Sequence, residues 1–410
     1  MQLSKLQPEQ LVKPRRFELR MSLVFASLFI SMGIHIPYFP LWLEHQGFRP
    51  EEIAVVLSAP LFLRVLTVPI ITALADRAGD RADVYIAAVA GALVLSAGYF
   101  LPPGYVTVLI VSLALQAVWT AHPPLADGLA LSGVRRFGVR YASMRIWGSI
   151  SYLMANFLAG VILSYTGAGA IPALISGALA VALAFSLLAP RLGRPRRATA
   201  PSATDLQRAA PLLTPYFLAF VMAAGAINSS HGYLFAFGSI YWKSLGIGDG
   251  VIGLLWAVAV LAEVGVFMIY TRVFGKTRAP GLLALAAIAG VMRWMAVPLV
   301  WPAGLGEGGF FATQVLHALS TGLVILGVQQ MIAETVSEER TGAAQGVAFF
   351  AHGVAMASVT LASGPLYEAF AGDGFYAMAG VAFAGLLLAG LAWRTQPQSV
   401  GPGGSSRDPE

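Results

Sequence analysis

Five charged side chains lie deep within long apolar stretches of this 410-residue sequence, and they are the residues best placed to do chemistry. They are Arg64, Asp127, Arg145, Glu263 and Arg293, and five of the six histidines occupy similar positions: His35, His122, His231, His317 and His352. A charge at the centre of a bilayer costs about 2.5–3.5 kcal/mol on insertion scales. We therefore expect these groups to face a polar cavity or a partner, away from lipid.

Polar and aromatic residues recur at helical spacing around several of these groups. Positions i, i+4, i+7 and i+11 share one face of a helix. Two stripes follow this spacing: Arg145, Ser149, Tyr152 and Asn156; and Ser31, His35, Tyr38 and Trp42. Two more begin with a step of three residues, Asn228, His231, Phe235 and Ser239; and Gln314, His317 and Thr321; and Trp256, Glu263 and Tyr270 recur every seven residues. The pattern predicts a polar cavity lined by some helices, while other helices form an apolar jacket.

Glu263 and Arg293 are the candidate pair for moving a proton, a choice that rests on the family resemblance given below. A carboxyl group in a low-dielectric site holds its proton more firmly than in water, and a nearby arginine favours its release. We expect Glu263 to pair with Arg293 in one conformation and to separate from it in another. The alternative is a permanent ion pair that locks the two helices together.

The balance of these charges indicates the sign of a ligand. Three arginines and two carboxylates in the apolar stretches leave one positive charge without a partner. An unpaired buried charge is costly, and arginine binds carboxylates through paired hydrogen bonds. We therefore expect an anionic ligand, although Arg64 pairing with a helix end or with water is the alternative. Residues expected around the ligand are Arg64, His231, Tyr38, Tyr152, Asn156, Trp256 and Gln314, with Phe235 adding to an aromatic wall.

The other histidines are weaker candidates. His231 is favoured because it lies on a stripe, whereas His35 and His122 either line the cavity or bond backbone carbonyls, and His352 is assigned to structure. We expect no metal site, because no pair of potential ligands shares helical spacing with a nearby carboxylate. His122-Pro123-Pro124 removes backbone donors and predicts a kink or an unwound turn, which membrane proteins tolerate where it lines a cavity.

Composition points to a membrane protein that is all-α. Hydrophobic residues make up 57% of the chain and charged residues only 11%, against roughly 25% charged in an ordinary soluble domain. A spanning helix needs about 20 mostly apolar residues. Twelve segments meet that rule: 18–42, 52–74, 84–102, 105–133, 142–164, 168–190, 213–242, 250–272, 279–301, 309–334, 342–367 and 374–394.

The distribution of Lys and Arg predicts the orientation of these segments. With both termini in the cytoplasm, the inner side carries 21 of the 26 Lys and Arg residues and the outer side carries only Arg49 and Lys243. Positive charge on the cytoplasmic side is the rule for membrane proteins. The basic net charge is thereby explained without nucleic acid. We expect an inner-membrane protein.

The same segments divide the chain into parts. We expect a cytoplasmic N-terminal segment (1–17), a six-helix bundle (18–190), a basic cytoplasmic linker (191–212), a second six-helix bundle (213–394) and a disordered cytoplasmic tail (395–410). The two halves echo each other at an offset of about 200 residues. Trp42 and Gly47 match Trp242 and Gly246, and the further matches are Gly160, Tyr165 and Gly167 with Gly364, Tyr367 and Gly372, and Gln116 with Gln314. Such repeats are typical of transporters built from two related halves.

The segment from Ala73 to Arg81, Ala-Leu-Ala-Asp-Arg-Ala-Gly-Asp-Arg, follows the second apolar segment. It resembles the loop signature of the major facilitator superfamily. In that family an Asp-Arg pair and a glycine help to hold the cytoplasmic gate closed. The resemblance implies the major facilitator fold and a gate formed by Asp76, Arg77, Gly79 and Arg81.

Almost the whole chain is similar to the branch of that superfamily that contains 3-phenylpropionate permease-like and lactose permease-like proton symporters. The resemblance is carried by Tyr38 to Gly47, Pro124 to Asp127, Arg145 to Ser149, Ser239 to Trp242, Ala262 to Val264, Val291 to Trp294 and Gln314 to His317. It implies that Asp127 and Arg145 frame the substrate, and that Glu263, Arg293 and His317 couple transport to protons. Ser320 stands where the lactose permease has a glutamate. This departure leaves Glu263 as the preferred proton carrier, with Asp127 second, and favours the phenylpropionate relatives.

These observations predict a secondary transporter that takes up a small organic solute with protons by alternating access. An aromatic or other monocarboxylate is the preferred substrate. A sugar or nucleoside symporter, a proton-driven exporter and an uncoupled facilitator are the alternatives. An enzyme is not expected, because the sequence has no cysteine, no His-Glu metal motif and no phosphate-binding glycine loop. We expect a monomer in the lipid bilayer, without cofactor, metal or nucleic acid.

Overall fold

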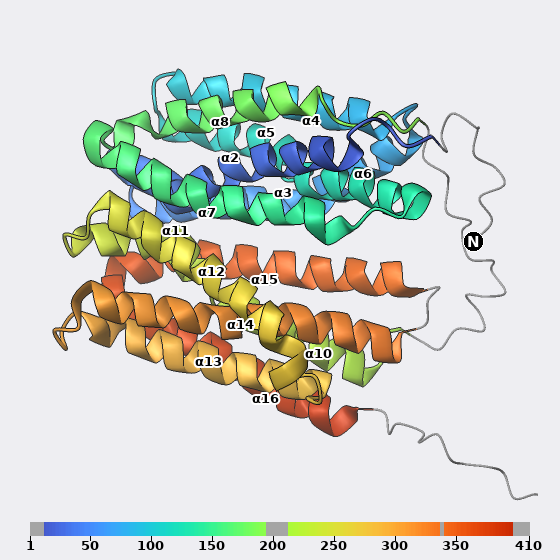
Figure 1. Ribbon diagram of the computed structural model, residues 1–410. Helices are drawn as coiled ribbons and strands as arrows, with labels where there is room; N and C mark the ends of the chain where they lie inside the picture. Colours follow the sequence, from blue (N-terminus) through green and yellow to red (C-terminus); the bar gives the residue numbers. More distant parts are fainter. Residues whose placement is uncertain (1–11, 194–211, 337–339, 397–410) are drawn as a thin grey trace, which may run out of the picture.

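The computed structural model describes residues 12–193, 212–336 and 340–396, and the parts it describes are helices joined by short connections (Figure 1). Ten stretches of these residues are long and apolar enough to cross a membrane. One of the ten, Thr341–Thr395, contains two long helices. The expected segment 213–242 is not among the ten, because it is divided into two helices that are each too short to cross a membrane alone. Each of the twelve predicted segments therefore coincides with helix. The predicted linker 191–212, tail 395–410 and N-terminal segment 1–17 lie largely outside the described residues.

The first half of the chain forms one bundle, drawn in blue to green in Figure 1. Its helices are α2 (Phe17–His45), α3 (Pro50–Arg77), α4 (Arg81–Ser96), α5 (Tyr105–Trp119), α6 (His122–Phe137), α7 (Tyr141–Thr166) and α8 (Ile171–Ser186). Short 3-10 turns at Ala97–Phe100 and Ala168–Ala170 adjoin α4 and α8. Helix α2 packs against α7 and α8, and α5 packs against α3 and α4.

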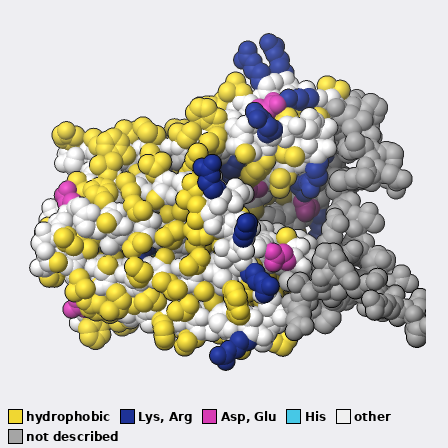
Figure 2. Space-filling model, turned by 60° about the horizontal axis from the view of Figure 1, so that its bottom comes forward, with side chains coloured by type: hydrophobic (Ala, Val, Ile, Leu, Met, Phe, Trp, Pro, Cys, Tyr) yellow, Lys and Arg dark blue, Asp and Glu magenta, His cyan; other side chains and the backbone are white. Residues whose placement is uncertain are grey.

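The second half forms the other bundle, drawn in yellow-green to red. Its helices are α10 (Pro215–Ser229), α11 (Gly232–Ser244), α12 (Asp249–Val273), α13 (Ala279–Val300), α14 (Gly306–Thr335), α15 (Thr341–Phe370) and α16 (Phe375–Thr395). Helix α13 packs between α14 and α16, and α10 packs against α15 and α16. Hydrophobic side chains cover much of the outer surface, while Lys and Arg gather toward the end that carries the termini (Figure 2).

Two of the membrane-crossing segments are broken. The break between α5 and α6 lies at Thr120 and Ala121, directly before His122-Pro123-Pro124, and confirms the predicted kink. The break between α10 and α11 was not predicted, because 213–242 reads as one continuous apolar segment. There, Ser230 Oγ donates to the carbonyl oxygen of Ile227 at 2.6 Å, and His231 Nδ1 lies 3.2 Å from the same oxygen. These side chains compete with the backbone ladder and interrupt the helix.

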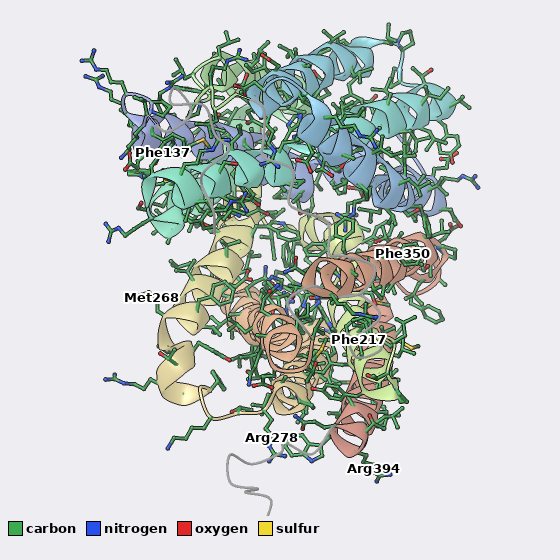
Figure 3. The ribbon with its side chains drawn as sticks, turned by 90° about the vertical axis from the view of Figure 1, so that its right-hand side faces the viewer. Phe137, Phe217, Met268, Arg278, Phe350 and Arg394 are labelled. Carbon is green, nitrogen blue, oxygen red and sulfur yellow. The ribbon has the colours of Figure 1, made fainter. Side chains whose placement is uncertain are left out.

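The two bundles meet along two seams, which appear on opposite sides when the molecule is viewed from the end that carries the termini (Figure 3). We call them the α3–α15 seam and the α7–α12 seam. In Figure 3, Phe350 of α15 and Met268 of α12 mark these two sides of the second bundle. Helices α7 and α12 lie together at the end opposite the termini, called here the far end, and diverge toward the termini (Figures 1 and 3).

The two halves repeat the same backbone geometry at the far end. Gly47 and Gly246 have φ angles of 82° and 84°, which glycine adopts without strain. In each turn the following amide donates five residues back at 3.1 Å, Phe48 to Leu43 and Ile247 to Trp242. The predicted match between Gly47 and Gly246 is therefore present in the backbone. Helices α3 and α12 follow these two turns, so they occupy equivalent places in the two halves.

Candidate functional site

A cavity of about 360 Å³ lies between the bundles. Its wall comes from α2, α3, α5 and α6 of the first bundle and from α11 and α15 of the second. The ionisable and amide side chains on this wall are His35, Arg64, Gln116 and His352, and the aromatic ones are Phe39, Trp119 and Phe235. An apolar cavity of this size with a few polar groups is the usual form of a small-molecule site.

Arg64 is the one arginine on the cavity wall among the described residues. It extends from α3 toward the second bundle, where its guanidinium carbon lies 5.8 Å from the ring centroid of Phe349 on α15. Its Nε is buried and has no hydrogen-bond partner in the described part of the chain. No ion pair of Arg64 is found within the same residues. A guanidinium in this setting is stabilised by any carboxylate that enters the cavity.

His352, which the sequence assigned to structure, also lies on the cavity wall. It belongs to α15, so it approaches from the bundle opposite Arg64. Its Nδ1 is buried and has no hydrogen-bond partner within the described residues. The two side chains therefore belong to helices that pack together at the α3–α15 seam. No sequence spacing marked His352, because it lies on no polar stripe.

Another part of the wall combines a histidine with aromatic rings. The Nε2 of His35 lies 3.3 Å from the amide nitrogen of Gln116. The His35 ring stacks on Phe39 at a centroid distance of 4.5 Å and meets Trp119 edge-on at 4.7 Å. His35 therefore lines the cavity, which was one of the two roles open to it from the sequence.

Several residues predicted to contact the ligand lie off the cavity wall. The hydroxyl of buried Tyr38 donates to the carbonyl oxygen of Asn156 at 2.7 Å, and it lies 3.5 Å from that of Asp249. Tyr38 and Asn156 therefore tie α2 to α7 and α12 at the far end. Trp256 stands behind the wall: its Nε1 donates to Ser239 at 2.9 Å, and its ring stacks on Phe235 at 5.8 Å.

A second cluster is buried inside the second bundle. Arg293, which is 0% exposed, bonds His317 Nδ1 at 2.9 Å and donates a short hydrogen bond to Gln314 Oε1. Its guanidinium lies 4.4 Å from the ring centroid of Trp294. His231 joins through Nε2, 3.0 Å from Ser320 Oγ, and its ring centroid lies 5.1 Å from that of His317. The structure thus brings Arg293, His317, Gln314 and His231 together. Ser320 also belongs to this cluster, whereas the sequence analysis noted it only as the residue that replaces a glutamate of the lactose permease.

Glu263 is separate from Arg293 in this conformation. No ion pair of Glu263 is present among the residues that the structure describes. Its carboxylate interacts electrostatically with Tyr152 of α7, on the other side of the α7–α12 seam. Glu263 also packs near Gly322 of α14: a Cβ added to Gly322 would lie 3.7 Å from the Cγ of Glu263. Glu263 therefore lies at the boundary between the bundles.

Asp127 and Arg145 form a third group in the first bundle. Tyr141, which the sequence analysis did not single out, donates to Asp127 Oδ1 at 2.7 Å. The Arg145 guanidinium stacks over Phe29 at 4.1 Å and interacts electrostatically with Asp127. Neither residue lies on the wall of the 360 Å³ cavity. The predicted framing of a ligand by this pair is therefore untested by the conformation seen here.

The loop between α3 and α4 holds part of the predicted gate. Arg81 bonds Asp76 through Nε at 3.0 Å, and its NH1 donates to Gly128 and Ser132 of α6 at 3.2 and 3.1 Å. Arg77 is exposed, and a Cβ at Gly79 would have no neighbour within 4 Å. The sequence missed Asp80, which accepts from the amides of Ala82 and Gly193 at 2.9 and 2.8 Å and so ties α4 to the chain after α8.

Comparison with known proteins gives a consistent answer. Residues 18–378 match the MFS_1 like family. A probable 3-phenylpropionic acid transporter of Escherichia coli (strain K12) is 26% identical over 375 residues, covering 90% of this chain and 96% of that protein. A maltose permease of Geobacillus stearothermophilus is 27% identical over 312 residues, covering 74% of this chain and 75% of that protein.

A solved structure supports the same fold. A crystal structure of a mutant of the nucleoside transporter NupG superposes with a TM-score of 0.80 at 13% identity, covering 93% of this chain and 100% of that one. The predicted all-α major facilitator fold is confirmed, and the helices are consistent with the predicted twelve membrane-crossing segments. The similar proteins are transporters and not enzymes, as the sequence predicts.

Proposed function

The chain belongs to the MFS_1 like family of membrane transporters, and we propose that it takes up a small organic anion together with protons. The preferred substrate is an aromatic or other monocarboxylate. The bundles expose the cavity alternately to the two sides of the membrane. The termini face the cytoplasm of the inner membrane, consistent with the Lys and Arg side chains at that end, and the transporter acts as a monomer.

The observation that carries the proposal is the state of Arg64. Its guanidinium lies on the wall of a cavity that Phe39, Trp119 and Phe235 also line, and its buried Nε has no hydrogen-bond partner in the part of the chain that the structure describes. A carboxylate supplies the missing counter-charge, and a ring attached to it occupies the aromatic walls. The similarity to a probable 3-phenylpropionic acid transporter supports the same substrate class.

Proton coupling is assigned to the α7–α12 seam. Glu263 lies at the bundle boundary without an ion-pair partner among the described residues, so its environment changes whenever the bundles rotate. A carboxyl group that alternates between a dry and a wet environment takes up and releases a proton. Arg293, His317 and Gln314 provide a buried positively charged cluster in the same bundle, and Asp127 is the second candidate carrier.

A neutral sugar or nucleoside is the alternative substrate. Ser112, Gln116 and Thr120 on the cavity wall are uncharged hydrogen-bonding groups suited to hydroxyls. The maltose permease and NupG similarities accord with this alternative. The direction of transport needs its own test, because the same fold supports export as well as uptake.

The test is uptake into proteoliposomes of radiolabelled 3-phenylpropionate, maltose and uridine, with and without an imposed pH gradient. We expect accumulation of 3-phenylpropionate alone, and only when the outside is acidic. The Arg64→Gln variant should lose at least tenfold in uptake, and Arg64→Lys should retain part of it, because lysine keeps the charge without the planar fork. Arg135→Gln, an exposed arginine on α6, is the matched control. Uptake of maltose or uridine at an equal rate by Arg64→Gln would refute the anion assignment.

A further inference from the structure

We propose that the carboxylate of the transported acid is held from both bundles at once, by Arg64 of α3 and His352 of α15. This proposal rests on the proposed function and adds a second anchor from the opposite half of the molecule. It makes the bound acid a bridge across the α3–α15 seam.

The backbone brings these two positions together. A Cβ at Gly353 would lie 2.9 Å from Val65 Cγ2, so α15 and α3 are in close contact at the residues that adjoin His352 and Arg64. Arg64 already reaches across this contact, because its guanidinium lies against the Phe349 ring one helical turn from His352. Both side chains line one cavity. We infer that one oxyanion in this cavity lies beside both of them.

The unsatisfied atoms match the chemistry of one carboxylate. Arg64 Nε and His352 Nδ1 are both buried, and neither has a hydrogen-bond partner within the described residues. A carboxylate has two oxygens and about four acceptor positions, so it accepts from both donors simultaneously. A buried donor left without a partner is costly, and the bound acid removes two such costs. A neutral amide has a single carbonyl oxygen and brings an N–H₂ group toward the arginine, so it satisfies the pair poorly.

The other histidine on the cavity wall already has partners, so Arg64 and His352 are the groups available to a charged ligand. His35 is engaged with Gln116 and with the rings of Phe39 and Trp119. Phe235 of α11 closes the wall beside them. These residues offer aromatic surface to a ring, while Arg64 and His352 offer hydrogen-bond donors to a carboxylate.

The bridge has a consequence for transport. A ligand that contacts both bundles binds more tightly when α3 and α15 are close together than when they are apart. It therefore stabilises the conformations in which the two helices stay close. The acid therefore favours particular arrangements of the bundles as well as filling the cavity. An acid bound to Arg64 alone has no such effect.

The test measures equilibrium binding to the purified full-length chain with two probes, 3-phenylpropionate and its neutral amide. The variants are Arg64→Gln, His352→Gln and the double variant, and the matched controls are Arg135→Gln and His45→Gln, which alter exposed residues. We expect each cavity variant to weaken acid binding about tenfold or more. We expect the double variant to lose less than the sum of the two single losses, since one ligand group makes both contacts. Amide binding should be weak in the unaltered chain and unchanged by either substitution.

Three results would overturn the proposal, and they separate it from the proposed function. Unaltered acid affinity in His352→Gln, with loss in Arg64→Gln, removes the bridge and leaves the anion transporter intact. Strictly additive losses show two independent contacts and also remove the bridge. Equal binding of acid and amide by the unaltered chain, or no binding of the acid, contradicts the proposed anion substrate itself. Thermal unfolding of each variant in detergent shows whether a lost affinity reflects a lost fold.

Discussion

The two seams between the bundles share one backbone arrangement and carry opposite charges. A Cβ at Gly364 of α15 would lie 2.8 Å from the carbonyl oxygen of Pro50, the first residue of α3. In the other seam, a Cβ at Gly160 of α7 would overlap the carbonyl oxygen of Asp249, the first residue of α12. Arg64 and Glu263 each follow their turn glycine by seventeen residues, so they occupy equivalent positions on α3 and α12.

The repeated scaffold thus places two different charged groups at two different seams. Arg64 lines a cavity at the first seam, whereas Glu263 lies on α12, which packs against α7 at the second. Because Arg64 and Glu263 lie on different seams, they do not form a permanent ion pair with each other. Such a pair would hold the bundles in one arrangement. Each charge is left available to a mobile partner. We infer an anion for Arg64 and a proton for Glu263.

The largest expected effect is on the α7–α12 seam. Glu263→Gln removes the proton-binding group but keeps its size, so accumulation driven by a pH gradient should fall to the level seen without a gradient. Exchange of labelled for unlabelled acid across the liposome membrane should persist, because it needs no net proton movement. Both are measured in the same proteoliposomes, with Glu307→Gln, an exposed carboxyl group on α14, as the control. Retained accumulation would show that the two seams do not divide the tasks in this way.

The second effect tests whether the seams are equivalent in closing the far end. Gly160→Ala and Gly364→Ala should each disfavour the closed contact by about 1–3 kcal/mol, which is roughly a 5- to 150-fold shift in population. Because the chain has no cysteine, a Val56→Cys reporter on the cavity wall, modified by an impermeant maleimide added from the far side, measures the opening. Gly177→Ala in α8, where a Cβ has open space, is the matched control.

The glycine variants also distinguish between the seams. Increased labelling in both variants supports two equivalent contacts. An increase in only one variant would show that a single seam closes the far end, and unchanged labelling in both would remove the glycines from the closing contact.

The comparison also shows how far the sequence alone could predict this molecule. Composition and segment length predicted the helices, because hydrocarbon thickness dictates both. Pro123 and Pro124 marked the break before α6, since proline removes a backbone donor. The break at Ser230 and His231 escaped prediction, because there the side chains bond local carbonyls and no proline marks the place.

The site was only partly predictable for a different reason. Helical spacing identifies a face but not the neighbour that the face meets. Tyr38 and Asn156 lie on polar stripes, yet they bond each other across α2 and α7 at the far end. His352 lies on no stripe, yet it reaches the cavity because Gly353 lets α15 approach α3. Arg293 and His317 were correctly expected to belong to one cluster, but that expectation came from family resemblance.

The smallest expected effect concerns the loops that follow α3 and α12. Asp80 is 8% exposed and bonds two backbone amides, whereas the loop after α12 carries Lys276 and Arg278 and no carboxylate. Asp80→Ala should lower the free energy of unfolding by about 1–2 kcal/mol, because it removes a helix cap and a second buried hydrogen bond.

Its matched control is Asp83→Ala, which removes an exposed ion pair with Arg191 and should cost less than about 1 kcal/mol. Both are measured by thermal unfolding in detergent at low and high salt. Only the Asp83 effect should shrink with salt, since exposed pairs are screened. Equal, salt-sensitive losses would show that Asp80 acts as a surface charge, and the loop after α3 would then differ from its counterpart only in charge and not in anchoring.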